Sequence, residues 1–268
     1  MKILCLIKQV PDSLEVHMNS GLTLERDFVA HVLNKADESA VELALQMKDA
    51  YGATVTAMTM GPLNAENILR ELLSRGVDHA LLITSPQFAG ADTLATARTL
   101  AAAARQTGPF DLLIFGRRSA DGETGQVGPM TCALLGIPCV ANVLSAKLMD
   151  RTVCAEQLTE EGISHWEAQL PAALTLCEWS YPLRLPALLG LKTARSAEIP
   201  HLRPEDIGLV PDLCGLKGSP TRVVSIRAHS AGVRPTQWIT AKEAAQISLA
   251  DGIEARIRLI DCVGFMVD

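Results

Sequence analysis

The sequence predicts an α/β fold: a parallel β-sheet flanked by helices, to which a small antiparallel sheet and an extended C-terminal arm are added. Two observations predict the parallel sheet. Short apolar runs alternate with stretches of helical periodicity through the first half of the chain, and one of these runs leads through a glycine-rich turn into a further helix. With 268 residues, of which 48% are hydrophobic, the chain can form one large domain with a buried core.

The first half of the chain consists of predicted strands that alternate with predicted helices. The strands are residues 3–7, 54–60, 80–84 and 111–115, and the helices are residues 37–51, 65–74, 92–105 and 129–135. In a parallel sheet with helical crossovers, ligands bind at the carboxyl ends of the strands. We therefore expect the turns at residues 8–12, 60–62 and 116–128 to lie together at one edge of the sheet.

After about residue 140 the pattern changes to short antiparallel strands and then to irregular, proline-rich chain. The predicted antiparallel strands are residues 143–150, 152–157 and 163–169, with residues 174–177 as one more, and the last predicted helix is residues 241–248. The predicted domains are an α/β domain over residues 1–182, a loop over residues 183–200 and an arm over residues 201–268. Because the arm is apolar but has no core of its own, we expect it to wrap another subunit; a disordered tail is the alternative.

Composition argues against several classes of function. A net charge of -6 without a basic run argues against nucleic acid as a partner. The seven cysteines are scattered and form no Cys-x-x-Cys pair, so they indicate neither a disulfide framework nor a zinc or iron–sulfur site. No apolar stretch reaches about 18 residues, so we expect no membrane insertion and a cytoplasmic location.

The glycine-rich turn at residues 116–131 has the features of an anion-binding site. A buried strand precedes it and a helix follows, so the free N–H groups of the first helical turn can hold a phosphate. Gly122, Gly125 and Gly128 allow close approach of the backbone, and Thr124 and Gln126 can add side-chain hydrogen bonds. The spacing matches neither a Walker loop nor Gly-x-Gly-x-x-Gly, so an ordinary strand-to-helix connection stays open as the alternative.

Several short motifs follow one another from Lys2 to about Thr221. They are Lys-Gln-Val-Pro-Asp at 8–12, Asn-Lys-Ala-Asp at 34–37, Thr-Met-Gly-Pro at 59–62, Gly-Ala-Asp-Thr-Leu-Ala-Thr at 90–96 and Ala-Asp-Gly-Glu-Thr-Gly-Gln-Val-Gly-Pro at 120–129. In this order and spacing, the chain resembles the beta subunit of electron transfer flavoproteins. The resemblance implies a Rossmann-like, adenine-nucleotide-binding fold and a heterodimer with an alpha subunit that carries FAD and around which the arm wraps.

The resemblance also implies that this chain has a nucleotide site of its own. Housekeeping members of the family hold AMP there. The sequence Gln-Val-Gly-Pro at 126–129 resembles instead the branch that binds a second FAD, which takes a hydride from NADH and can bifurcate the electron pair. That branch usually has a proline and an aromatic residue within the motif at 34–37, which this chain lacks, so AMP stays open as the alternative ligand. The dehydrogenase partner in the family is often an acyl-CoA dehydrogenase.

The family's site residues can be carried over by position. Leu6 and Met60 match contacts to the adenosine, and Leu188 matches the anchor for the dehydrogenase partner. The residues that match the phosphate side are Asp92, Thr93, Thr96, Asp121, Thr124, Gly125, Gln126, Val127, Gly128 and Thr131.

Three of these residues have a structural alternative. The alternative for Asp92 is a helix N-cap, and the alternative for Asp121 is that it orders its turn without contacting a ligand. The alternative for Leu188 is packing on its own subunit. No catalytic side chain is predicted, because a flavin carries its own chemistry, and whether the chain is an enzyme outside a complex stays open.

Overall fold

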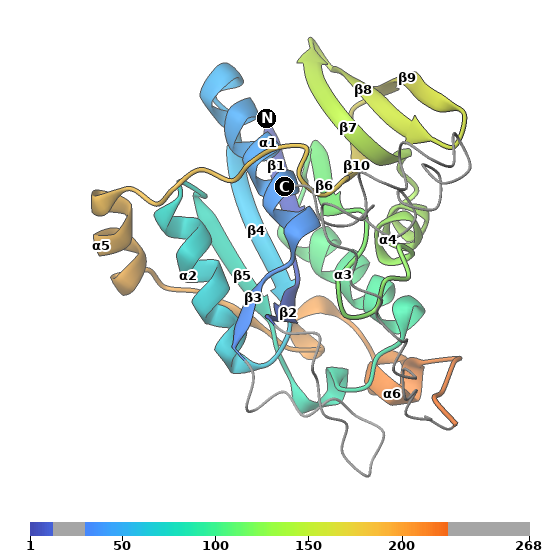
Figure 1. Ribbon diagram of the computed structural model, residues 1–268. Helices are drawn as coiled ribbons and strands as arrows, with labels where there is room; N and C mark the ends of the chain where they lie inside the picture. The colour runs from blue at the N-terminus through green and yellow to red at the C-terminus, as the bar shows by residue number, and fades with distance from the viewer. Residues whose placement is uncertain (13–29, 225–268) are drawn as a thin grey trace, which may run out of the picture. The chain divides into compact units, whose positions relative to one another are not determined.

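The computed structural model describes residues 1–12 and 30–224, and nine of the eleven strands in these residues form one sheet (Figure 1). The strand order is β11-β5-β4-β1-β6-β10-β7-β8-β9. Neighbouring strands pair in parallel from β11 to β7, and β7, β8 and β9 pair antiparallel. The predicted α/β fold is therefore confirmed, and its antiparallel strands continue the parallel sheet.

In the first half of the chain, every predicted strand and helix is present, with ends that differ by at most two residues. The elements are β1 (Lys2–Leu6), α1 (Lys35–Tyr51), β4 (Thr54–Met60), α2 (Glu66–Ser74), β5 (His79–Ile83), α3 (Thr93–Thr107), β6 (Leu112–Gly116) and α4 (Val127–Leu135). The periodicity did not predict β2 (Gln9–Pro11) and β3 (His31–Leu33), which pair as a separate two-stranded antiparallel sheet. Strands of three residues are too short to give a periodic signal.

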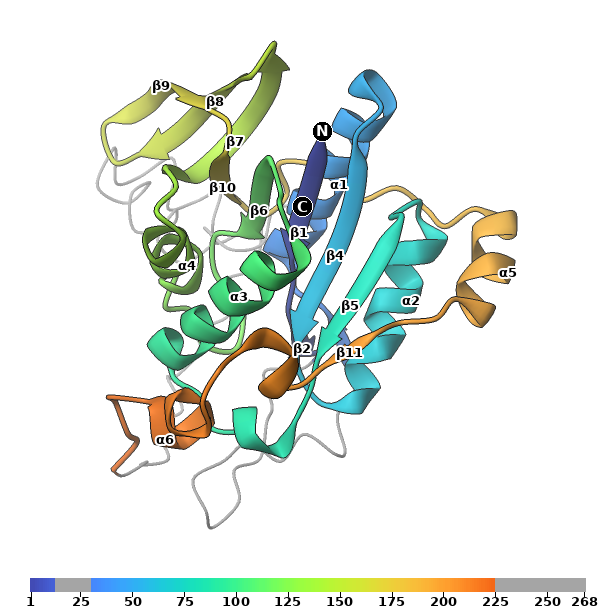
Figure 2. The ribbon, with the colours of Figure 1, turned by 180° about the vertical axis from the view of Figure 1, so that it is seen from behind.

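The helices cover the two faces of the sheet in pairs. Helices α1 and α2 pack on one face, and α3 and α4 on the other (Figures 1 and 2). Along β1, Ile3 and Cys5 belong to the first core cluster, whereas Leu4 and Leu6 belong to the second. Because both faces are covered, the strand is apolar and buried from Ile3 to Leu6, and this is why a continuous apolar run predicted it.

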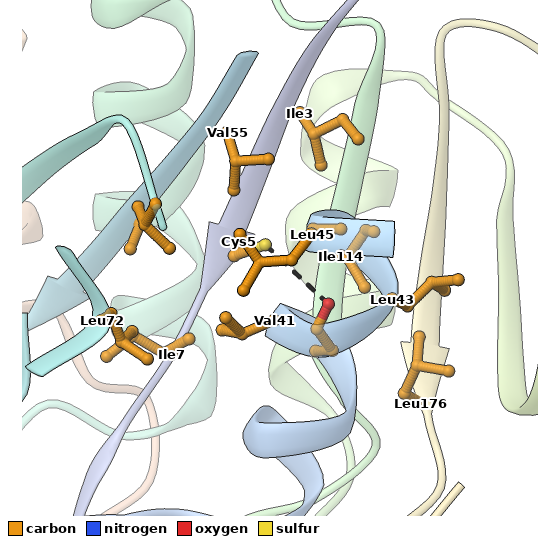
Figure 3. Close-up of a cluster of buried hydrophobic side chains, with 14 of the residues drawn as sticks. Ile3, Cys5, Ile7, Val41, Leu43, Leu45, Val55, Leu72, Ile114 and Leu176 are labelled. Carbon is orange, nitrogen blue, oxygen red and sulfur yellow. Dashed lines mark hydrogen bonds between the residues drawn. The ribbon is translucent and has the colours of Figure 1, made fainter. Parts of the chain in front are cut away.

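Cys5 illustrates how the cysteines are used in the core. Its thiol points from β1 toward the main-chain carbonyl of Ala40 in α1, among aliphatic side chains (Figure 3). Burial and the nearby charge of Asp37 raise the pKa of this thiol. Cys5 therefore stays neutral and serves as a small core residue.

The second half of the chain adds a meander and one central strand. Strands β7 (Cys139–Met149), β8 (Thr152–Thr159) and β9 (Gly162–Gln169) pair antiparallel as predicted. The prediction of a further antiparallel strand at residues 174–177 was wrong: β10 (Ala172–Leu176) lies between β6 and β7 and is parallel to both. All its residues are buried, as a central strand requires.

Beyond β10, the chain packs along the opposite edge of the sheet. Helix α5 (Leu188–Ser196) lies against α2, and β11 (His201–Leu202) pairs with β5. Three-residue 3₁₀ turns occur at Leu63–Ala65, Pro86–Phe88, Glu205–Ile207 and Pro211–Leu213, and the last helix is α6 (Gly215–Gly218). Residues 225–268, with most of the predicted arm and the predicted helix at 241–248, lie outside the described residues. Within the described part of the chain, no helix combines the length and apolar character needed to cross a membrane.

Candidate functional site

The order of the strands places a topological switch point between β1 and β6. The chain proceeds from β1 outward to β4 and β5, then crosses to β6 on the other side of β1. At this point Leu6 is in register with Phe115, so the carboxyl ends of β1 and β6 are adjacent. Ligands of open α/β sheets bind in the crevice outside such a point. The turns that follow β1, β4 and β6, at residues 8–12, 60–62 and 116–128, therefore begin at the same edge of the sheet, as expected.

Leu6 and Met60 end two neighbouring strands at this edge. Leu6 is buried and pairs with Met58 in register, while Met60 is half-buried. Thr59, which precedes Met60, is also buried, and its hydroxyl has no hydrogen-bond partner among the described residues. An unpaired buried hydroxyl at the end of a strand is available to a ligand or to water. Thr59 begins the motif at residues 59–62, but the sequence assigned it no role in the site, since threonine is common in strands.

The N-termini of α3 and α4 meet at the glycine-rich turn. The hydroxyl of Thr93, the first residue of α3, donates a hydrogen bond of 3.2 Å to Oε1 of Gln126, the N-cap of α4. Thr96 follows one turn into α3 and is half-buried. Two helix N-termini side by side concentrate free N–H groups and partial positive charge, which suits an anion.

Asp92 is the N-cap of α3, so the structural interpretation of this residue is confirmed. Its Oδ1 accepts a hydrogen bond of 2.9 Å from the main-chain N–H of Ala95. Its Oδ2 accepts from both the main-chain N–H (3.0 Å) and the hydroxyl (2.7 Å) of Thr221. Partial burial acts to raise the pKa of Asp92, but these hydrogen bonds outweigh it and hold the pKa below its ordinary value. The carboxylate thus also fixes the chain near residue 221 to the start of α3.

The turn between β6 and α4 is held from the side of β1. Nζ of Lys8 forms an ion pair with Asp121 at 2.6 Å and donates to the hydroxyl of Ser119 at 3.3 Å. Thr124 and Gly125, nearer to α4, are exposed, and Gly125 has a left-handed backbone with φ of 61°. Asp121 therefore orders the turn by binding Lys8, whereas Thr124 and Gly125 are open to a ligand.

Val127, Gly128 and Thr131 lie in the first turns of α4 and set its packing. A Cβ atom on Gly128 would lie 2.8 Å from Cγ2 of Thr175 in β10, so this position has room only for glycine. The hydroxyl of Thr131 is buried and donates to the main-chain carbonyl of Val127 at 2.7 Å. These residues bring the helix close to the sheet beneath the turn.

A further residue, Asp37, joins the two strand ends. The residue is 4% exposed. Its Oδ2 accepts from the main-chain N–H of Lys8 at 2.7 Å, and its Oδ1 accepts from that of Gly116 at 3.0 Å. Burial raises its pKa to about 7, against the effect of these hydrogen bonds and of the Lys8 charge. One signal in the sequence could have identified Asp37 as a buried residue. It is a charged side chain next to Ala36 and close to Ala40 and Val41, at the start of a buried helix.

A cavity of about 470 Å³ adjoins the glycine-rich turn. Arg117, Arg118 and Ala120 line it from the turn, and Leu144, Leu158 and Trp179 line it from the other side. Arg117 and Arg118 both form ion pairs with Glu178, at 2.7 and 3.0 Å. The cavity therefore offers apolar walls and paired arginines. Thr93 and Gln126 are not among its lining residues.

Leu188 is the first residue of α5 and is 88% exposed. Leu185 and Leu189 beside it are also exposed. The helix is attached through its other residues, since Arg70 of α2 donates to the carbonyl oxygens of Ala194 and Ala197, each at 2.9 Å. Leu188 therefore does not pack on the described part of its own chain and is free to contact a partner.

Comparison with known proteins identifies relatives along most of the chain. A family model described as "Electron transfer flavoprotein domain" matches residues 21–207. The caffeyl-CoA reductase-Etf complex subunit CarD of Acetobacterium woodii is 40% identical over 225 residues, which cover 83% of this chain and 86% of CarD. Protein FixA of Bradyrhizobium diazoefficiens is 37% identical over 261 residues (94% and 90%). The electron transfer flavoprotein subunit beta of Thermoanaerobacterium thermosaccharolyticum is 38% identical over 227 residues (84% and 87%).

Proposed function

The chain belongs to the electron transfer flavoprotein family as a beta-type subunit, and we propose that it binds FAD at the switch point between β1 and β6. In this proposal it passes electrons between NADH or a dehydrogenase and the FAD of an alpha subunit. Bifurcation of the electron pair is the form of this activity favoured by the sequence at residues 126–129.

The observation that carries the proposal is the pair of helix N-termini joined through Thr93 and Gln126. They suit the pyrophosphate of a dinucleotide, and the exposed backbone at Thr124 and Gly125 adds free N–H groups. In this proposal Leu6 and Met60 border the adenosine, and their position at the ends of β1 and β4 supports this role.

The cavity beside the turn favours FAD over a mononucleotide. AMP needs only the turn and the strand ends, whereas FAD also needs space for its flavin ring. Leu144, Leu158 and Trp179 give this cavity apolar and aromatic walls that suit a flat ring. The bound flavin would supply the hydride and single-electron chemistry, while the chain supplies position and electrostatics.

An acyl-CoA dehydrogenase or a related reductase is the proposed dehydrogenase partner. Relatives of this chain include the caffeyl-CoA reductase-Etf complex subunit and an acryloyl-CoA reductase electron transfer subunit gamma from Anaerotignum propionicum. In this proposal Leu188 docks the partner; its exposure at the start of a helix that is bound to α2 by other residues supports the role. One fully buried leucine contributes roughly 1.5 to 3 kcal/mol.

A second candidate is a subunit that holds AMP as a structural ligand and docks the dehydrogenase without redox chemistry of its own. The pairing of Arg117 and Arg118 with Glu178 favours it, because the charges of these two arginines of the cavity are already compensated. The motif at residues 34–37, which lacks the proline and the aromatic residue, favours it as well.

Ligand content separates the two candidates. We would co-express the chain with an alpha subunit, release the ligands of the purified complex with acid, and quantify FAD and AMP per heterodimer. Two FAD and no AMP are expected, followed by oxidation of NADH. One FAD with one AMP would rule out a redox-active site in this chain and leave the structural role.

A further inference from the structure

Asp37 connects the two strands between which the proposed ligand binds. Each oxygen of its carboxyl group accepts one main-chain N–H: that of Lys8 just after β1 and that of Gly116 at the end of β6. The adjacent Asn34 extends this connection. Its side chain donates to the carbonyl of Arg118 at 2.9 Å and accepts from the N–H of Ala120 at 3.1 Å. The start of α1 therefore fixes the spacing of both loops at the switch point.

The ionised form of Asp37 makes both contacts at full strength. A carboxylate is a strong acceptor at each oxygen, whereas the hydroxyl oxygen of a protonated carboxyl group is a weak acceptor whose O–H must turn away from the main-chain N–H donor. Protonation thus weakens one of the two hydrogen bonds. A Cβ atom on Gly116 would lie 2.2 Å from Oδ1, so the close approach of the carboxyl group depends on glycine at this position.

The charged groups near Asp37 are paired with partners other than its carboxyl group. Cys5 on β1 has a raised thiol pKa and stays neutral. Lys8 directs its ammonium group to Asp121. On the side of β6 and β10, Arg117 and Arg118 are paired with Glu178, whose pKa lies below its ordinary value. Burial raises the pKa of Asp37 itself to about 7.

We propose that Asp37 is a positioning residue whose ionised carboxylate holds the ends of β1 and β6 in the arrangement that the nucleotide needs, so that nucleotide binding strengthens as this group loses its proton. This inference rests on the proposed nucleotide site. It adds to that site a dependence on pH that comes from the protein.

The test is titration of FAD and of AMP into the nucleotide-free, full-length chain between pH 6 and pH 8. The diphosphate of FAD has no group that titrates in this range. For the wild type, the affinity for FAD is expected to rise about tenfold from pH 6 to pH 8, because protonation at low pH weakens one of the hydrogen bonds of Asp37. Asp37→Asn, which cannot ionise, should bind weakly and equally at both values. Glu38→Gln, which removes a charge one position along α1, should follow the wild type.

Each alternative outcome has a distinct meaning. If FAD binds but its affinity does not change with pH, or if Asp37→Asn follows the wild-type profile, the positioning role is wrong and the nucleotide site stands. If only AMP binds, the dependence of its affinity on pH is compared between the wild type and Asp37→Asn. Equal dependence in the two proteins means that the positioning role is wrong. If neither nucleotide binds, the proposed site and the positioning role both fail.

A second variant approaches the same contact from β6. Gly116→Ala should displace the carboxyl group and reduce binding at pH 8 to the level of Asp37→Asn. If these substituted chains do not fold, the profile of the wild type with FAD decides alone, and a flat profile overturns the proposal.

Discussion

Asp37 links the proton equilibrium of one buried residue to the stability of the fold. Its pKa is raised from 3.8 in the unfolded chain to about 7 in the folded protein. Between these values Asp37 binds more protons in the folded state than in the unfolded state, so its contribution to the free energy of unfolding falls as pH rises through this range and is constant above it. The effect on stability is thus opposite in sign to the effect proposed for nucleotide binding.

A measurement of stability against pH checks this linkage. From pH 5 to pH 8, Asp37 should reduce the free energy of unfolding of the nucleotide-free chain by on the order of 2 kcal/mol. The free energy of unfolding is measured by urea denaturation at each pH. Its decrease with pH should be smaller in Asp37→Asn, which lacks the ionisable group, and unchanged in Glu38→Gln. Equal slopes for the wild type and Asp37→Asn would show that Asp37 has an ordinary pKa.

For single residues, the sequence predicted which segments lie at the candidate site better than it predicted which atoms bind one another there. The motif at residues 120–129 and the residues at the start of α3 do meet, as the bond between Thr93 and Gln126 shows. Asp37 was not predicted as part of the site, because its partners are main-chain N–H groups at Lys8 and Gly116, distant in sequence. Every residue except proline has a main-chain N–H, so the residue types at these positions do not show which N–H groups Asp37 binds.

Among the elements, α3 depends on one carboxylate that has two functions. Asp92 caps the helix at Ala95 and binds Thr221. Asp92→Ala should lower the free energy of unfolding by about 1 to 2 kcal/mol, since it removes the cap and the tether together. Thr221→Val, which removes only the hydroxyl, should cost about half of that. The measurement is urea denaturation, with Asp92→Asn as a control that retains a capping side chain. Equal losses in Asp92→Ala and Thr221→Val would mean that the cap adds nothing.

Helix α5 should separate docking from folding. Leu188→Ala should leave the midpoint of thermal unfolding unchanged, because the side chain is 88% exposed. It should raise the Kd for the dehydrogenase by roughly tenfold or more, as expected for a leucine buried on binding. Met149→Ala, a substitution of another exposed apolar residue at the end of β7, is the control. An unchanged Kd in Leu188→Ala would exclude this leucine as the anchor.

For the whole molecule, nucleotide binding should stabilise the fold by mass action. At a free concentration one hundred times the Kd, the gain is about 2.7 kcal/mol. FAD should therefore raise the midpoint of thermal unfolding by several degrees. Riboflavin, which has the flavin ring but no adenine nucleotide, should give no comparable shift. Equal shifts with riboflavin and FAD would place the affinity outside the switch-point site.

At this scale the sequence predicted the layers of the fold and missed part of its topology. The parallel half was predicted because each strand is a short apolar run between helical stretches. The direction of β10 was not, since the same run is compatible with either direction, and only its pairing with both β6 and β7 decides it. Pairing partners that are distant in sequence have no local signature.

The position of β10 also has a consequence for synthesis on the ribosome. Strands β6 and β7 emerge before β10, and each keeps an unpaired edge until residues 172–176 arrive between them. Exposed edges of this kind pair readily with other chains. A nascent chain that stalls within the β7–β9 meander would therefore be prone to aggregation, and the sheet closes only when this short late strand is inserted.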